Sequence, residues 1–117
     1  MLRCRFSLAR LAVVIGACAL PIAAATPGRA QDSSYSLTIH DSNFEPSTLN
    51  VKAGVKFKLF VKNARKVSAE FESAELNREK VVPPGQTVVI YVGPLAPGTY
   101  PFLDDFHQST HGQIVAK

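Results

Sequence analysis

The stretch Val55-Lys56-Phe57-Lys58-Leu59-Phe60-Val61-Lys62 decides the fold class, because apolar and basic residues alternate along it. One face holds Val55, Phe57, Leu59 and Val61, and the other face holds Lys56, Lys58 and Lys62. An alternation with a period of two residues is typical of a β-strand with one buried and one solvated face. This segment is therefore predicted to be a half-buried strand.

Further short segments of the same kind follow one another, separated by turn signals such as Pro83-Pro84-Gly85. The predicted strands cover residues 35–40, 49–51, 55–62, 69–73, 76–82, 86–92, 99–103 and 112–116. Segment 86–92 is apolar on both faces, which predicts a central strand, and segment 104–111 is predicted to be a loop. Seven or eight short strands without a convincing helical segment predict an all-β fold, either an antiparallel β-sandwich or a small barrel.

The first thirty residues differ from the rest of the chain. They contain four arginines, no acidic residue, an apolar stretch from Leu11 to Ala25, and a small-residue exit at Gly28-Arg29-Ala30. This layout predicts a cleaved signal peptide at residues 1–30, a single domain at residues 31–117, and a location in the periplasm. The apolar stretch is shorter than a membrane-spanning helix requires. An alternative is a lipoprotein anchored at Cys18.

Removal of this segment changes the composition. The four arginines are among 13 basic residues, so nine remain against nine acidic residues, and a basic surface for nucleic acid is not expected. Both cysteines (Cys4 and Cys18) and the methionine Met1 also lie in this segment. A mature chain without sulfur excludes a disulfide framework, a thiolate metal site and a methionine-rich Cu(I) site.

Two segments resemble the cupredoxin family, small periplasmic β-sandwiches that include the blue copper proteins. The first reads FEPSTLNVKAG at residues 44–54, and the second reads YPFLDDFH at residues 100–107, followed by His111-Gly112. The resemblance implies a cupredoxin-like sandwich with a metal-ligand loop before the last strand. Asp104 stands where that family has its cysteine, His107 matches the family histidine, and His111 lies near the methionine position. A blue copper centre needs the thiolate, so this chain is not expected to be a usual blue copper carrier.

A closer resemblance is to the cupredoxin-like domains of bacterial periplasmic iron-uptake systems. It is carried by residues 70–73, 76–82, 93–95 and 105–107. It implies a role in acquiring or oxidising iron, with iron or copper(II) as the bound ion, and with a membrane iron permease or a periplasmic iron-binding protein as the partner. It also implies a place for Glu70 in the metal site.

The residues around Asp104 support such a site on their own. Asp104 has the same strand parity as Phe102 and should point inward, where a carboxylate is costly unless it is paired or bound to a metal. The predicted metal ligands are Glu70, Asp104, His107 and His111. In the alternative interpretation, Asp104 or Asp105 caps the loop through backbone N–H groups, and Glu70 pairs with nearby basic residues such as Arg78 and Lys80.

Three functions follow as hypotheses. The first is a periplasmic metal-binding protein that assists the acquisition or oxidation of iron. The second is a metal-free interaction module that docks through Phe60 and the lysine row at residues 56, 58 and 62. The third is a Cu(II) carrier. No catalytic constellation is recognisable, so enzymatic activity beyond an accessory oxidation of ferrous iron is not expected.

Overall fold

The structure, a computed structural model, describes residue 16 and residues 21–26 and 33–117. Nine strands lie in residues 33–117, which confirms the all-β prediction. They are β1 (Ser33–Ile39), β2 (Phe44–Glu45), β3 (Thr48–Val51), β4 (Phe57–Asn63), β5 (Ala69–Ser73), β6 (Arg78–Val82), β7 (Thr87–Val92), β8 (Gly98–Asp104) and β9 (His107–Ala116).

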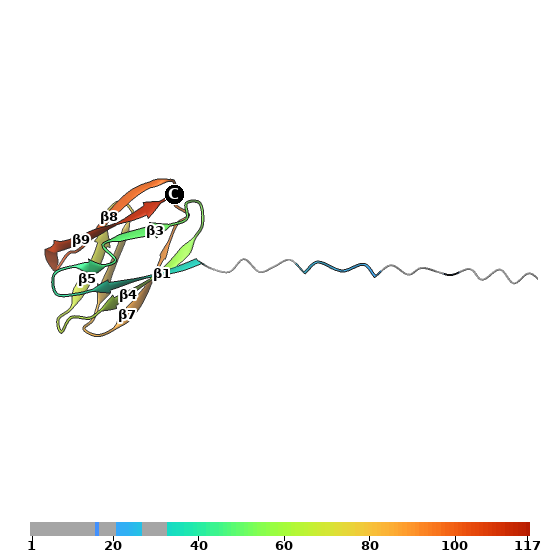
Figure 1. Cartoon of the computed structure of the whole chain (residues 1–117). Coiled ribbons are helices and arrows are strands. Elements are labelled where there is room, and N and C mark those ends of the chain that lie inside the picture. Colours follow the sequence, from blue (N-terminus) through green and yellow to red (C-terminus); the bar gives the residue numbers. More distant parts are fainter. Residues whose placement is uncertain (1–15, 17–20, 27–32) are drawn as a thin grey trace, which may run out of the picture.

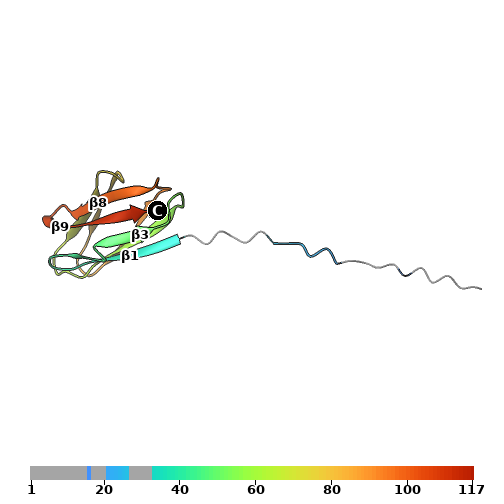
Figure 2. The ribbon, with the colours of Figure 1, turned by 45° about the horizontal axis from the view of Figure 1, so that its top comes forward.

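The strands form two sheets that pack face to face as a sandwich (Figure 1). The order is β2-β1-β4-β7 in the four-stranded sheet and β3-β9-β8-β5-β6 in the five-stranded sheet. Figure 2 shows β3, β9 and β8 of the second sheet side by side. The pairs β1–β4 and β3–β9 are parallel and the other pairs are antiparallel, so both sheets are mixed and not purely antiparallel as predicted.

The core lies between the sheets and follows the predicted alternation. In β4, Phe57, Leu59 and Val61 are buried, whereas Lys62 is exposed. Near one end of the sandwich three buried aromatic rings stack together. The ring of Phe102 lies edge-on to that of Phe44, with centroids 4.8 Å apart, and 5.2 Å from that of Phe71. Burial of a phenylalanine side chain stabilises the folded state by about 1.5–3 kcal/mol. This cluster therefore holds the two sheets together near that end of the sandwich.

Two local predictions were wrong. Segment 86–92 is not central, because β7 is an edge strand of the four-stranded sheet. Its second apolar face is partly exposed at Val89 and Tyr91. Residues 104–111 are not a loop either, since β9 begins at His107 and only a two-residue turn separates it from β8. The side chain of Asp104 holds this turn by accepting a hydrogen bond from the backbone N–H of Phe106 within it.

The predicted signal peptide, including Cys18, lies largely outside the described residues, and the described residues 16 and 21–26 have no regular secondary structure. In the described part of the chain, no helix is long and apolar enough to cross a membrane.

Candidate functional site

One end of the sandwich collects the polar residues, because three chain segments meet there: the loop at residues 64–68, the start of β5 and the end of β8. Asn63, at the end of β4, shapes the loop with a fully buried amide. Its Nδ2 donates to the carbonyls of Val67 (2.8 Å) and Val82 (2.9 Å), and its Oδ1 accepts from the N–H of Arg65 (2.9 Å). The loop is thereby folded back so that Arg65 reaches the end of β8.

Asp104 is fully buried, as its strand parity predicted, and four donors surround it. Its Oδ1 accepts from the backbone N–H groups of Glu70 (2.9 Å) and Phe106 (3.1 Å). Its Oδ2 lies 3.4 Å from Nη1 of Arg65 and 3.0 Å from Nδ1 of His107. The Arg65 side chain is only 10% exposed, and that of His107 is 35% exposed. The capping role weighed for Asp104 is therefore what the structure contains.

These contacts show whether Asp104, which stands where blue copper proteins have their cysteine ligand, could hold a copper ion. No thiolate is available, and a guanidinium cation occupies the space beside the carboxylate that replaces it. A metal ion at Oδ2 would have to displace Arg65, whose Nε is already buried without an acceptor. The residues present at this position do not fit a blue copper ion.

A second group of acidic side chains lies beside this network, on the outward face of the five-stranded sheet. Because Phe71 is fully buried, Glu70 and Glu72 project to the opposite face of β5. The β5–β6 register places Glu79 directly across from Glu72. Asp105 is fixed next to them, since its backbone N–H donates to the carbonyl of Glu70 at 2.9 Å. We call Glu70, Glu72, Glu79 and Asp105 the carboxylate cluster.

The electrostatics of the carboxylate cluster are unfavourable without a cation. A carboxyl–carboxyl hydrogen bond with Glu79, together with burial and the charges of Asp105 and Glu72, raises the pKa of Glu70 from 4.5 to about 7. A similar contact with Asp105 raises the pKa of Glu72. Within residues 33–117 none of the four makes a salt bridge with lysine or arginine. Like charges opposite each other destabilise a sheet, so this arrangement favours the uptake of protons or of a cation.

The structure brings some of the four predicted ligands together and separates others. Asp104 and His107 are in contact, and Glu70 is bound to Asp104 through its backbone N–H while its carboxylate belongs to the carboxylate cluster. His111 is the cross-strand partner of Leu103. It lines a hollow of about 510 Å³ together with Glu72 and other residues, apart from Asp104 and His107. Among the described residues, no three His, Cys, Asp or Glu side chains are placed so that they could hold a metal ion.

The sequence prediction missed Arg65 as the partner of Asp104 and Glu79 as the neighbour of Glu70. The turn at residues 74–77, closed by Asn77 with its positive φ of 51°, could have revealed Glu79. A hairpin closed at this turn pairs Ser73 with Arg78 and therefore Glu72 with Glu79. The alternative pairing of Glu70 with Arg78 is not what the structure contains, because the guanidinium of Arg78 donates to backbone carbonyls.

Comparisons with known proteins agree with this fold. A family profile described as "Cupredoxin-like domain" matches residues 10–116. An uncharacterized protein of Rickettsia prowazekii (strain Madrid E) is 42% identical over 74 residues, which is 63% of this chain and 59% of that protein. The matched part thus spans less than two thirds of that relative.

Solved structures with the same fold include copper proteins. Auracyanin A, a "blue" copper protein of Chloroflexus aurantiacus, matches with a TM-score of 0.62 and 15% identity, covering 74% of this chain and all of that chain (100%). The metal-binding domain of a Cu(I)-exporting P-type ATPase of Streptococcus pneumoniae D39, determined with Cu(I), matches with a TM-score of 0.65 and 13% identity, covering 72% and 84%. At such identities the similarity concerns the fold.

Proposed function

We propose, because this chain belongs to the cupredoxin-like domain family, that it is a metal-binding protein whose cation site is the carboxylate cluster. The family relation supports a transition metal, and the network around Asp104 argues against the thiolate position as its site. In this proposal the cation is bound by oxygen donors at the same end of the sandwich, on the outward face of β5 and β6.

The proposal rests on the burial of Glu70 and on the acidic groups that surround its carboxylate. This residue is only 7% exposed, and its carboxylate faces three other acidic groups without a basic partner. Its backbone N–H and C=O are both fixed by the β8–β9 turn, so it cannot easily withdraw from its neighbours. A divalent or trivalent cation would remove the mutual repulsion, and the carboxylates would have to move together to enclose it, because no three of the described acidic, histidine or cysteine side chains are placed to hold an ion.

The donor chemistry narrows the choice of metal. Carboxylate oxygens are hard donors that suit magnesium, calcium and manganese best, accept iron and copper(II) among the transition metals, and suit Cu(I) poorly. Protons compete with the metal for the same carboxylate oxygens. Because the pKa of Glu70 is raised to about 7, this competition is strongest at pH values below about 7. Binding should therefore tighten as the pH rises through 7.

Iron is the metal that the sequence resemblance favours, and a role in its acquisition or oxidation remains a prediction. So do a location in the periplasm and a partnership with a membrane iron permease or a periplasmic iron-binding protein. Copper(II) carriage is the competing role for the same cluster. A competition titration in which copper(II) is added to the iron-loaded protein separates the two.

The proposal is tested by calorimetric titration of the purified protein with Fe(II) under anaerobic conditions at pH 7.5. We expect one ion per chain, and a loss of affinity of about tenfold or more in Glu70→Gln, equivalent to at least about 1.4 kcal/mol. The control is Glu45→Gln, an exposed carboxylate on β2 that should leave binding unchanged. Equal affinity and stoichiometry in wild type and Glu70→Gln would refute the site.

A metal-free interaction module is the second candidate function, and the Arg65–Asp104 ion pair favours it. This pair fills the end of the sandwich with the chain's own cation. The module hypothesis predicts that the purified protein takes up neither iron nor copper in the same titration.

A further inference from the structure

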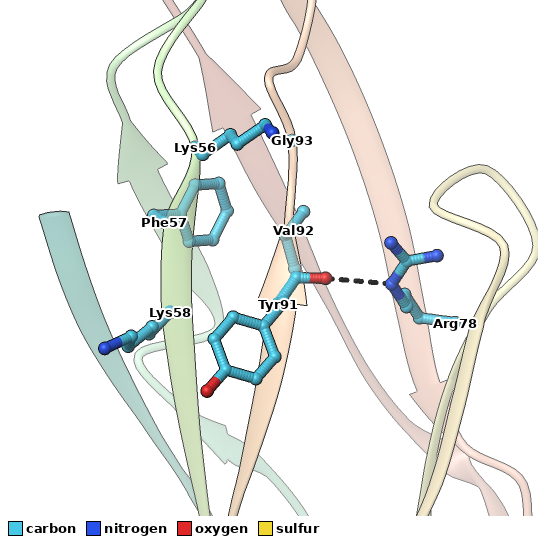
Figure 3. Close-up of a pocket in the computed structure, with 7 residues that line it drawn as sticks. All are labelled: Lys56, Phe57, Lys58, Arg78, Tyr91, Val92 and Gly93. Atoms are coloured by element: carbon cyan, nitrogen blue, oxygen red, sulfur yellow. Dashed lines mark hydrogen bonds between the residues drawn. The ribbon is translucent and has the colours of Figure 1, made fainter. Parts of the chain in front are cut away.

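A basic hollow lies where β4 and the edge strand β7 of the four-stranded sheet meet the start of β6 in the other sheet. The hollow has a volume of about 380 Å³. It is lined by Lys56, Phe57, Lys58, Arg78, Tyr91, Val92 and Gly93, and every charged residue in this lining is basic (Figure 3). We call it the basic hollow.

Arg78 is held in place at the rim of the basic hollow. It begins β6 and reaches across to the edge strand β7, where its Nε donates to the carbonyl of Tyr91 at 2.9 Å (Figure 3). Its Nη1 donates to the carbonyl of Asn77 at 2.9 Å. These bonds fix the guanidinium before any ligand arrives, so little conformational entropy is lost when it binds an anion.

Tyr91 is the apolar platform of the basic hollow. It is the cross-strand partner of Lys58, whose Nζ lies 6.0 Å from the centre of its ring, and it is 65% exposed. Val89, on the same face of the edge strand, is also exposed. A large aromatic residue next to arginine and lysine is the composition that protein interfaces concentrate at their energetic centre.

We propose that the basic hollow docks an acidic peptide segment of a partner protein. Three basic side chains, Lys56, Lys58 and Arg78, line it from different sides and no acidic residue does, which is complementary to an extended run of aspartate or glutamate. The apolar stems of such a segment would lie on the ring of Tyr91. The inference goes beyond the proposed metal function and does not depend on it, because no residue of the carboxylate cluster lines the basic hollow.

The basic hollow and the carboxylate cluster are connected through β6. Glu79 of the carboxylate cluster follows Arg78 directly in β6, but the cluster faces outward from the five-stranded sheet. Arg78 also lines a neighbouring hollow of about 280 Å³ together with Glu72 and Glu79, so the basic hollow adjoins the carboxylate cluster.

The test uses a fluorescein-labelled octaglutamate peptide and fluorescence anisotropy at low ionic strength, with EDTA present so that metal binding plays no part. We expect saturable binding that weakens at least about tenfold in Lys56→Glu and about fivefold in Tyr91→Ala. Lys52→Glu, an exposed residue directly after β3 with the same charge change, is the control and should bind within about twofold of wild type. If Lys52→Glu weakens binding as much as Lys56→Glu, or if neither variant does, the proposal is wrong.

A second copy of the chain is the competing occupant, since its carboxylate cluster is also acidic. Sedimentation of the wild-type protein distinguishes the two occupants. Concentration-dependent self-association that Lys56→Glu abolishes would overturn the peptide proposal, whereas a monomer that still binds the peptide supports it.

Discussion

Replacement of Asp104 by asparagine tests whether this buried carboxylate is a structural group or a metal ligand. The substitution keeps the shape of the side chain and removes its charge. Oδ1 could still accept from the N–H groups of Glu70 and Phe106. The new amide nitrogen would face the guanidinium of Arg65 and the ring nitrogen of His107, which are themselves donors.

The cost can be worked from these contacts. Arg65 would remain 90% buried without a counter-charge, since its side chain is 10% exposed. Breaking a buried ion pair by removing one partner costs about 3–5 kcal/mol. In a domain of 60–100 residues about 1 kcal/mol corresponds to roughly 4–8 °C in Tm, so Asp104→Asn should lower Tm by at least about 12 °C.

The assay is thermal and urea unfolding, followed by far-UV circular dichroism without metal. Asp41→Asn, an exposed residue between β1 and β2, is the matched control and should stay within about 0.5 kcal/mol of wild type. A metal ligand freed of its charge would leave the metal-free protein as stable as before, or more stable. A loss below about 1 kcal/mol in Asp104→Asn would therefore refute the structural role.

Three further predictions concern packing, the loop and pH. A Cβ at Gly112 would lie 2.6 Å from the carbonyl oxygen of Ser47 and 2.7 Å from Cζ of Phe102, so Gly112→Ala should destabilise the fold by about 1–3 kcal/mol in urea unfolding; an unchanged midpoint would contradict the contact. Asn63→Ala leaves three hydrogen-bonding groups unpaired and should cost about 2–4 kcal/mol, measured in the same way, with a neutral result excluding its role in the loop. The pKa of Glu70 is raised by folding from 4.5 to about 7, so the folded chain binds more protons between these values and its stability should fall as the pH rises from 4.5 through 7. Glu70→Gln should flatten this pH profile, and a profile equal to that of wild type would show that Glu70 is not the group responsible.

The sequence was sufficient for the sandwich because its signals are local. Alternation in residues 55–62 and the Pro-Gly turns report which faces are buried, and β4 follows them closely. The inward direction of Asp104 was predictable for the same reason, since strand parity continues from Phe102 to the end of β8. The edge position of β7 was not predictable from its composition, because apolar residues on two faces can mean either burial or an exposed contact surface.

The candidate site was only partly predictable because its contacts join distant segments. Arg65 and Asp104 are far apart in the sequence and meet through the fold of the loop that Asn63 holds. Glu70 was predicted as a ligand, but its nearest acidic neighbour depends on the register of the β5–β6 hairpin. A single residue of difference in the turn would have moved Glu79 to the other face.

The most direct measurement of the central claim is an anomalous-difference map of crystals grown with Fe(II), collected at the iron edge. A metal peak enclosed by the carboxylates of Glu70, Glu79 and Asp105, with the Arg65–Asp104 pair intact, is the result that we expect. A peak coordinated by Asp104 and His107 with Arg65 displaced would contradict the claim, as would crystals whose carboxylate cluster holds no iron.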